Sequence, residues 1–231
     1  MKTLGLLGGM SWQSTVPYYQ LINLRVAERL GGYHSARLLL FSVDFADIER
    51  RMHAGQWDEA GELLGDAARR LETAGAELIV LCTNTLHRVA PSIERGLGVP
   101  FLHVADVTSQ AIGAAGVRWV GLLATRFTME DGFYVERLAS RGVEAMVPEP
   151  PEREALHRII FDELVHGRVN ETARRTVREI SHQLVGRGAG GIILGCTELG
   201  MVLSSADVPF PVFDTTLLHA RAAADRALED R

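Results

Sequence analysis

Two short segments place a cysteine and small polar residues directly after an apolar run. The first is "ELIVLCTNTLH" at 77–87, and the second is "GGIILGCTELG" at 190–200; they hold Cys82 and Cys196, the only cysteines in 231 residues. A thiol suits proton transfer near neutral pH, because hydroxyls, amides and helix N-termini around it can lower its ordinary pKa of about 8.5. These segments are therefore the first candidates for a catalytic site.

The two segments are parts of an internal duplication. "LGLLGG" at 4–9 echoes "VGLLAT" at 120–125, "GAELIVLCTNT" at 75–85 echoes "GAGGIILGCTE" at 188–198, and "VPFLHVAD" at 99–106 echoes "VPFPVFD" at 208–214. Three echoes in the same order indicate two lobes of similar topology. We predict lobes at 1–115 and 116–210, with a C-terminal helix within 211–231 that packs on the first lobe.

The duplication also fixes which residues correspond. Aligning 75–76 with 188–189 puts Thr83, and not Cys82, opposite Cys196. Neighbouring side chains on a strand point to opposite faces. If Cys196 faces a cleft, the residue that faces it from the other lobe is Thr83, and Cys82 points back into a core as a small hydrophobe.

Short apolar runs alternate with segments of helical period, which is typical of parallel sheets flanked by helices. We predict an α/β fold with two pseudo-symmetric lobes, each a mostly parallel sheet flanked by helices, and an active site in the crevice between them. The expected strands are 4–7, 37–43, 77–81, 100–103, 119–123, 144–147, 191–194 and 211–213. The expected helices are about 15–30, 58–73, 107–114, 131–140, 153–165, 171–185 and 215–228, and "EPPE" at 149–152 is interpreted as a turn.

Composition excludes several classes of protein. A net charge of −5 argues against a nucleic-acid surface, which normally needs a basic face. No apolar run approaches the roughly 20 residues of a membrane span, and the N-terminus reads as a first strand and not a signal peptide. Two cysteines without a secretory signal favour the reducing cytoplasm. The histidines do not fall at zinc-ligand spacing, and "GLLGGMSW" lacks the glycine spacing of a dinucleotide site, so no cofactor or metal is expected.

The expected chemistry follows from the position of the two segments. Ligands of α/β sheets bind beyond the carboxyl ends of the strands, where 83–85 and 196–198 lie. Two facing loops could address a small molecule from both sides, which inversion of a stereocentre requires. One group removes the α-proton, another returns a proton to the opposite face, and backbone N–H groups hold the carboxylate.

These motifs resemble the aspartate/glutamate racemase family over nearly the whole chain. "GLLGGMSWQST" looks like its amino-terminal loop, "LCTNTLH" and "LGCTEL" like its active-site loops, and "HVAD", "TRFTME" and "FDTT" like its connecting motifs. Glutamate racemases usually begin with Asp-Ser-Gly, and this chain has Gly8-Gly9-Met10-Ser11, so it looks closer to the aspartate racemase branch. The resemblance implies an isomerase that needs neither pyridoxal phosphate nor metal.

The resemblance also implies roles for single residues. In most members the first loop reads Cys-Asn-Thr; its Asn and Thr match Asn84 and Thr85, so the catalytic position falls on Thr83. Cys196 matches the second-loop cysteine, which in the family acts on the L enantiomer, and a subgroup with Thr in the first position is regarded as specific for L-Asp and L-Glu. We therefore expect Cys196 to remove the α-proton and Thr83, or a water it holds, to return one.

The remaining predictions concern substrate contacts. Met10, Ser11, Asn84, Thr85, Thr197 and Glu198 are expected to bind the substrate, and Arg51, Arg126 or Arg168 to pair with its side-chain carboxylate. Met52 stands where family members have a polar contact, which leaves the choice between Asp, Glu and other amino acids open. The chain is expected to form a homodimer.

Two alternatives remain from the sequence. A lyase or decarboxylase of the same fold would need only one cysteine to protonate a carbanion. A non-catalytic binding protein for small dicarboxylic acids would keep affinity without proton exchange. The polar loops argue against the apolar pocket that a departing carboxylate needs.

Overall fold

The computed structural model describes residues 1–229 and divides the chain into two compact units. The first comprises Met1–Val104 together with the C-terminal helix from His219 onward, and the second comprises Ala105–Leu218. The sequence-based division placed these boundaries after residues 115 and 210. Residues 230 and 231 of the expected C-terminal segment lie outside the described residues.

The first unit is built on a parallel four-stranded sheet. Its elements are β1 (Leu4–Gly8), α1 (Trp12–Leu30), β2 (Leu38–Ser42), α2 (Phe45–His53), α3 (Trp57–Thr73), β3 (Leu78–Leu81), a 3-10 turn η1 (Thr85–Val89), α4 (Ala90–Glu94) and β4 (Phe101–Leu102). The strand order is β2-β1-β3-β4, and Leu4 pairs with both Leu38 and Leu78. β1 is therefore a central strand and β2 an edge.

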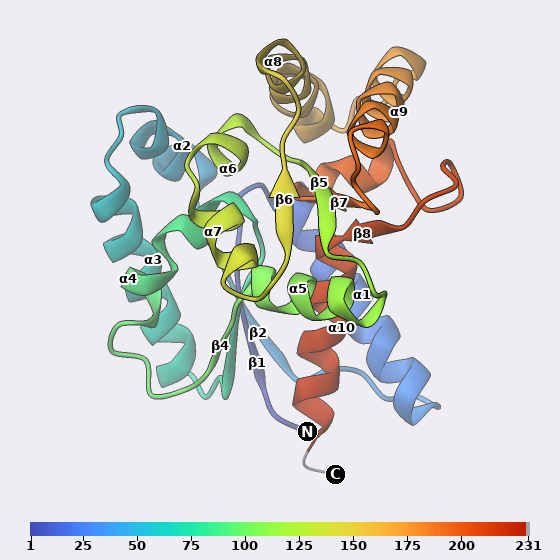
Figure 1. The fold of residues 1–231 in the computed structure, drawn as a ribbon. Coiled ribbons are helices and arrows are strands. Elements are labelled where there is room, and N and C mark those ends of the chain that lie inside the picture. Colours follow the sequence, from blue (N-terminus) through green and yellow to red (C-terminus); the bar gives the residue numbers. More distant parts are fainter. Residues whose placement is uncertain (230–231) are drawn as a thin grey trace. The chain divides into compact units, whose positions relative to one another are not determined.

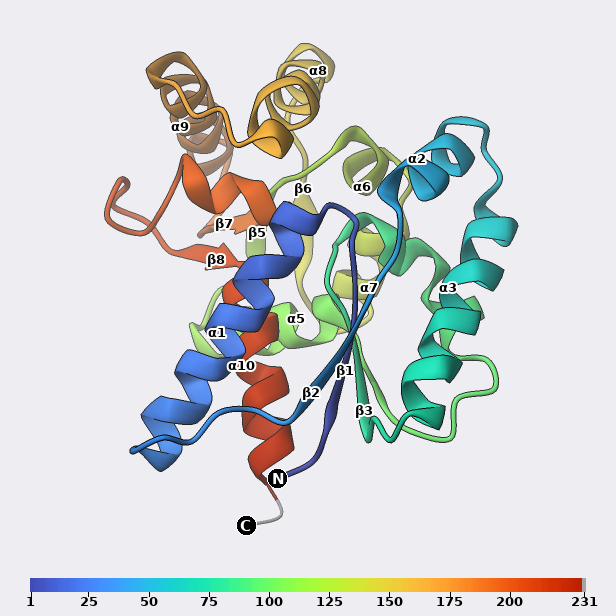
Figure 2. The same cartoon turned by 180° about the vertical axis from the view of Figure 1, so that it is seen from behind.

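Helices cover both faces of this sheet. α1 and α10 (Thr215–Leu228) lie side by side on one face, and α3 lies on the other (Figures 1 and 2). The N–H of Lys2 donates to the carbonyl of Ala227, so α10 is tied to the start of the chain. Strands buried on both faces consist of near-continuous apolar residues, as β1 and β3 do.

The second unit repeats this plan. Its elements are α5 (Val104–Ala114), β5 (Trp119–Leu123), α6 (Arg126–Glu130), α7 (Phe133–Ala139), β6 (Glu144–Met146), α8 (Pro150–Arg158), a π turn η2 (Ile159–Glu163), a 3-10 turn η3 (Leu164–His166), α9 (Glu171–Gly186), β7 (Ile192–Leu194), a 3-10 turn η4 (Thr197–Met201) and β8 (Val212–Asp214). All strand pairs are parallel, in the order β6-β5-β7-β8. The predicted duplication and the α/β class are confirmed.

One glycine in each central strand shows how closely the two plans agree. A Cβ on Gly5 would stand 2.7 Å from Ala76 and 3.3 Å from Leu71, at the end of α3. A Cβ on Gly121 would stand 2.7 Å from Ile192 and 2.8 Å from Leu184, in α9. In both units the missing side chain lets a helix pack directly on the central strand.

Two local predictions were wrong. The "EPPE" segment begins a helix: α8 has prolines at its first positions, where no N–H partner is lost, and the N–H of Glu149 donates to Glu152 at 2.9 Å in a capping box. Residues 126–130, which the expected helices left out, form α6, because the Thr125 hydroxyl accepts from the N–H of Thr128 and caps a helical turn. In both places side-chain caps decide where the helix starts.

Candidate active site

The loop after β3 places the predicted residues Thr83, Asn84 and Thr85 at the carboxyl end of a central strand. All three are buried, and η1 begins at Thr85. The preceding residue, Cys82, is fully buried, and burial raises the pKa of its thiol. The prediction that Cys82 serves as a core residue is confirmed.

Backbone hydrogen bonds give the same register in the two units. The N–H of Cys82 donates to the carbonyl of Leu7 at 2.9 Å, and the N–H of Gly195 donates to that of Leu123 at 2.7 Å. Leu7 and Leu123 are the equivalent residues of β1 and β5. Cys82 therefore corresponds to Gly195, and Thr83 occupies the position that Cys196 has in the second unit.

The ring of His87 holds the Thr83 loop through hydrogen bonds to the backbone. One ring nitrogen, Nδ1, lies 2.7 Å from the carbonyl oxygen of Thr83, and the other, Nε2, accepts from the N–H of Val104 at 3.2 Å. Because a backbone N–H can only donate, Nε2 is unprotonated, and Nδ1 carries the proton that it donates to Thr83. Burial, and then the nearby His103 and His219, hold the pKa of His87 well below its usual value.

Further histidines surround this ring. The ring centroids of His87 and His103 are 4.6 Å apart, and those of His87 and His219 are 5.8 Å apart. Nε2 of His219 lies 2.9 Å from the carbonyl oxygen of Leu102, so it donates, and Nδ1 then accepts from the Tyr18 hydroxyl at 2.9 Å. Burial lowers the pKa of His219 to about 4. The first unit therefore backs its loop with buried imidazoles, of which His87 and His219 are neutral.

Met10 and Ser11 follow β1 and are both buried. The Ser11 hydroxyl accepts from the N–H of Ser14 and caps α1, while Thr15 accepts from the N–H of Gly9 at 2.8 Å and donates to the carbonyl of Ser11 at 2.9 Å. A Cβ on Gly8 would stand 2.4 Å from Thr15. Gly8 is thus required for a close approach to Thr15, and the Gly9 N–H has an internal partner.

The loop after β7 carries Cys196, Thr197 and Glu198. The thiol of Cys196 donates to Oε2 of Glu198 at 2.9 Å, and the hydroxyl of Thr197 donates to the same oxygen at 2.6 Å. Cys196 and Glu198 are both buried, with exposed fractions of 8% and 6%. The tight η4 turn brings side chains two residues apart into this contact.

This arrangement corrects one expectation. The flanking groups were expected to lower the pKa of the catalytic thiol, but the pKa of Cys196 is raised well above its usual value. Burial is the first cause, because it disfavours the thiolate, and the negative charge of Glu198 is the second. The resting thiol is therefore protonated and aimed at a carboxylate.

Asp214, at the end of β8, adds a second, half-buried acid to this unit. It accepts from the N–H groups of Thr216 and Leu217, and burial raises its pKa. By strand register it corresponds to His103 of the first unit, since Ile193 pairs with Phe213 as Val80 pairs with Leu102. The second unit therefore has carboxylates at the carboxyl ends of β7 and β8, where the first unit has imidazoles.

The three candidate arginines all have local partners. Arg51 donates to the carbonyl of Asp47 at 2.6 Å, Arg126 lies 3.4 Å from Glu154, and Arg168 donates to the carbonyl of Asp162. Arg126 begins α6 just after β5, the strand that pairs with β7, so it lies at the same sheet edge as Cys196. Pairing with a substrate carboxylate stays a prediction for each.

Most of the predicted residues follow directly paired strands: Met10, Ser11 and Thr83–Thr85 follow β1 and β3, and Arg126 and Cys196–Glu198 follow β5 and β7. Arg51, in the last turn of α2, and Arg168, after η3, do not. Sequence reasoning missed His87, whose signal was its position four residues after Thr83. Among residues 1–229, no group of three or more His, Cys, Asp and Glu side chains is arranged to hold a metal ion, and no helix is long and apolar enough to cross a membrane.

The chain consists of two repeated parallel α/β units. Each unit has polar side chains at the carboxyl ends of its central strands, and these define an α/β protein with candidate sites at the strand ends. The family model of the Asp/Glu/Hydantoin racemases matches residues 7–223, so the chain belongs to this family of amino-acid racemases, which are isomerases.

Similar proteins support this assignment over full lengths. A crystal structure from Yersinia pestis, assigned to the Asp/Glu racemases, is 50% identical with a TM-score of 0.93, covering 99% of this chain and 100% of that one. An aspartate racemase homologue from Pyrococcus horikoshii is 35% identical with a TM-score of 0.86, at the same coverage. The broad-specificity amino-acid racemase RacX of Bacillus subtilis is 24% identical over 97% of this chain and 98% of its own length.

Proposed function

We propose that the protein racemises an acidic amino acid, L-aspartate or L-glutamate, by removing its α-proton and returning a proton to the opposite face. The observation that carries this proposal is the contact of 2.9 Å between the Cys196 thiol and buried Glu198 at a strand end. A thiol next to a proton acceptor is the arrangement that general-base catalysis by sulfur needs. The proposed reaction uses no cofactor.

In the proposed mechanism, Glu198 accepts the thiol proton and does not bind the substrate carboxylate. A second carboxylate at Oε2 would meet like charge, so the earlier assignment of Glu198 to substrate binding is less favourable than a role as proton acceptor. Forming the thiolate is costly in the free protein, because the pKa of Cys196 is raised. The α-ammonium group of a bound amino acid brings positive charge near the sulfur and offsets that cost.

Every proton that moves in the proposed cycle is returned or replaced. The thiolate of Cys196 takes the α-proton of the L-amino acid and becomes a thiol again. Thr83, or a water held by its hydroxyl, gives a proton to the opposite face of the carbanion, and solvent replaces it. Glu198 returns its proton to solvent, so the cycle consumes none. Thr83 is assigned to this role because it occupies the position equivalent to Cys196.

The remaining polar residues are proposed to hold the substrate. Asn84, Thr85 and Thr197, with Met10 and Ser11 at the neighbouring loop, are candidates to bind the α-carboxylate and the developing enolate. Arg51, Arg126 and Arg168 are candidates for the side-chain carboxylate, and each would exchange its present partner for the substrate. The name of the RacX relative indicates that other amino acids belong in any substrate test.

The test is solvent exchange. The protein is incubated in heavy water with a panel of L- and D-amino acids, and deuterium at the α-carbon is followed by NMR. We expect exchange with L-Asp or L-Glu and its loss, by at least about 10²-fold, in Cys196→Ser. Exchange by Cys196→Ser at the wild-type rate would contradict the assignment of Cys196.

The matched control is the other cysteine. Cys82→Ala removes a fully buried sulfur, and we expect it to lower the free energy of unfolding by on the order of 1 kcal/mol while exchange continues. Loss of exchange in a folded Cys82→Ala protein would instead assign the chemistry to residue 82.

A further inference from the structure

Thr83 is held by its backbone on both sides. Its N–H donates to the carbonyl of Leu81 at 2.9 Å, and its carbonyl oxygen lies 2.7 Å from Nδ1 of His87. The first contact closes a tight turn at the end of β3. The second comes from a side chain four residues further on, so it fixes the loop that carries Thr83 against the following turn, η1.

The imidazole that makes this contact has one position and one tautomer. Nε2 of His87 accepts from the N–H of Val104 at 3.2 Å, and Val104 is the first residue of α5. The first N–H groups of a helix have no partner within the helix, so the imidazole supplies one. The rings of Phe101, His103 and His219 pack against it, with centroids at 5.5, 4.6 and 5.8 Å. A ring that is bonded at both nitrogens and packed in this way cannot turn without losing a hydrogen bond.

The second unit carries a glycine in place of this imidazole. Counting along the duplication, the residue that corresponds to His87 is Gly200. A Cβ on Gly200 would stand 3.0 Å from Oδ2 of Asp214, so a carboxylate occupies the space beside the backbone there. The carbonyl of Cys196 instead accepts from the N–H of Leu199, within η4, at 3.2 Å. The imidazole contact therefore belongs to the first loop, while the second loop is held by its own backbone.

His87 itself is not placed to react. Both of its ring nitrogens are used in backbone contacts, and its exposed fraction is 2%. Burial first, and then His103 and His219, hold its pKa well below the usual value, so the ring stays neutral. Any influence of this ring on a reaction must therefore pass through the loop that it holds.

We infer that His87 is a positioning residue for the step in which a proton returns from the Thr83 side, and this inference rests on the proposed function. The hydroxyl of Thr83, or a water that it holds, must lie within hydrogen-bond reach of the carbanion. An error of about 1 Å in such a placement can slow a step by about 10²-fold. Removal of the His87 contact should therefore slow proton return on this side and leave proton removal by Cys196 as it is.

The test compares inversion with exchange in heavy water. An L-amino acid that has lost its α-proton to Cys196 becomes deuterated L product when a deuteron returns from the same side, and deuterated D product when it returns from the Thr83 side. Chiral chromatography with mass spectrometry follows both products of L-Asp and L-Glu at the initial rate. We expect His87→Ala to lower the ratio of D to L deuterated product by about tenfold and to keep the rate of deuterated L product within about threefold. An unchanged ratio would overturn the inference.

Two amide variants separate the two contacts of the ring. In His87→Asn the amide nitrogen takes the place of Nδ1 and can still donate to the carbonyl of Thr83. In His87→Gln the amide lies near the place of Nε2, and its oxygen can still accept from the N–H of Val104. We expect His87→Asn to bring the product ratio to within about threefold of the wild type, and His87→Gln to leave it as low as His87→Ala does. Recovery by His87→Gln as full as that by His87→Asn would overturn the inference.

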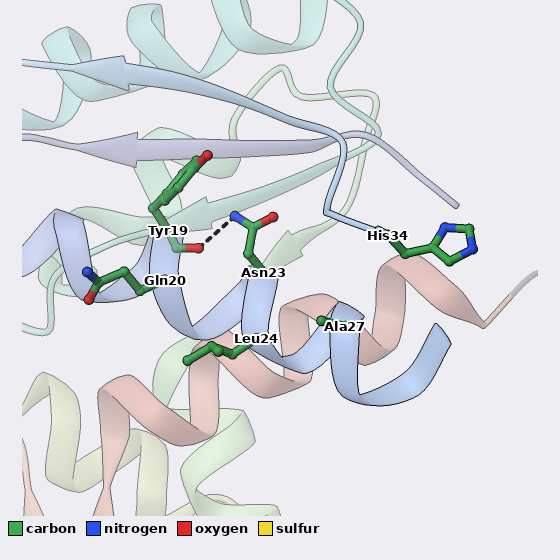
Figure 3. Close-up of a pocket in the computed structure, with 6 residues that line it drawn as sticks. All are labelled: Tyr19, Gln20, Asn23, Leu24, Ala27 and His34. Carbon is green, nitrogen blue, oxygen red and sulfur yellow. Dashed lines mark hydrogen bonds between the residues drawn. The ribbon is translucent and has the colours of Figure 1, made fainter. Parts of the chain in front are cut away.

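The matched control is a histidine elsewhere in the same unit. His34 is exposed and lines a hollow of about 510 Å³ on the outside of α1. Figure 3 shows it on the loop that precedes β2. The same substitutions there, His34→Ala and His34→Asn, should leave the product ratio at its wild-type value. A ratio that falls as far in these variants as in His87→Ala would overturn the inference.

A second measurement needs no substrate. Amide hydrogen exchange of the free protein compares the N–H of Thr83 with that of Gly195, which reports on the stability of the second unit. In His87→Ala the protection of the Thr83 amide should fall by about tenfold relative to that of Gly195, because the loop opens more often. Equal relative protection in the wild type and His87→Ala would overturn the inference even if substrates exchange normally. Deuterium at the α-carbon of no substrate, with this loss of protection as expected, would instead contradict the proposed function and the step assigned to His87.

Discussion

The loops after β3 and β7 have the same backbone register, but different groups contact them. An imidazole contacts the first loop and a carboxylate contacts the thiol of the second. In the first unit, the carbonyl of Thr83 accepts from a neutral, buried His87, and no acid takes part in that contact. In the second unit, the thiol at the equivalent position donates to the buried carboxylate of Glu198. The duplicated scaffold thus holds one loop with an imidazole and places a thiol beside a carboxylate in the other. This difference predicts that the second loop starts the reaction and that the first mainly orients.

Among the variants that test this difference between the loops, Glu198→Gln is expected to have the largest effect. The substitution keeps the shape of the side chain and removes its charge, so the pKa of Cys196 should fall, because the charge that raises it is gone. Exchange should nevertheless slow by about 10²-fold, because the thiol has lost its proton acceptor. The thiol pKa is read from ultraviolet thiolate absorbance in a Cys82→Ala background. Faster exchange in this variant would show that Glu198 only suppresses the thiol.

The buried histidines predict that the first unit loses stability in acid. His219 has an ordinary pKa of about 6.5 when unfolded and about 4 in the folded protein, so the unfolded state binds more protons between these values. The contribution of His219 to the free energy of unfolding is fully present above pH 6.5. It is lost as the pH falls toward 4, by on the order of 3 kcal/mol.

Urea unfolding across this pH range measures the effect, with His219→Gln as the control. The amide can still hydrogen-bond but cannot titrate, so the dependence of stability on pH should weaken by up to one proton. An unchanged pH dependence would mean that His219 is not the titrating group.

Thr83→Cys tests the same difference between the loops and is expected to change exchange the least. It makes the two loops alike at the reacting position, and a thiol is a far better base than a hydroxyl. We expect exchange of the D enantiomer to rise by about tenfold, equivalent to about 1.4 kcal/mol in the barrier. Thr83→Ser keeps the hydroxyl and should leave the preference for L substrates as it is. If neither variant changes the ratio of enantiomers, another group serves the second face.

Much of this architecture was predictable because it rests on repeated local patterns. The apolar runs specify the strands, and the echo of Gly5 in Gly121 specifies how a helix approaches each sheet. The equivalence of Thr83 and Cys196 follows from counting residues, since a strand leaves no freedom in which way the next side chain points.

The chemical backing was not predictable in the same way. The contact between Cys196 and Glu198 depends on the tight turn of η4, and a sequence does not show which oxygen a glutamate will present. His87, His103 and His219 meet although they are far apart in the chain, and their roles follow from which backbone groups they find there. The start of α8 at Pro150 was missed because a pair of prolines signals a turn as readily as the first turn of a helix.

The bond between His219 and Leu102 joins residues 117 positions apart. On a ribosome that adds about 5–20 residues per second, the carbonyl of Leu102 is therefore made roughly 6–23 seconds before its donor. The second unit is continuous in sequence and can close as it emerges, whereas the unit begun first can only be finished last. Nascent chains of this protein should consequently depend on protection by chaperones until α10 has been made.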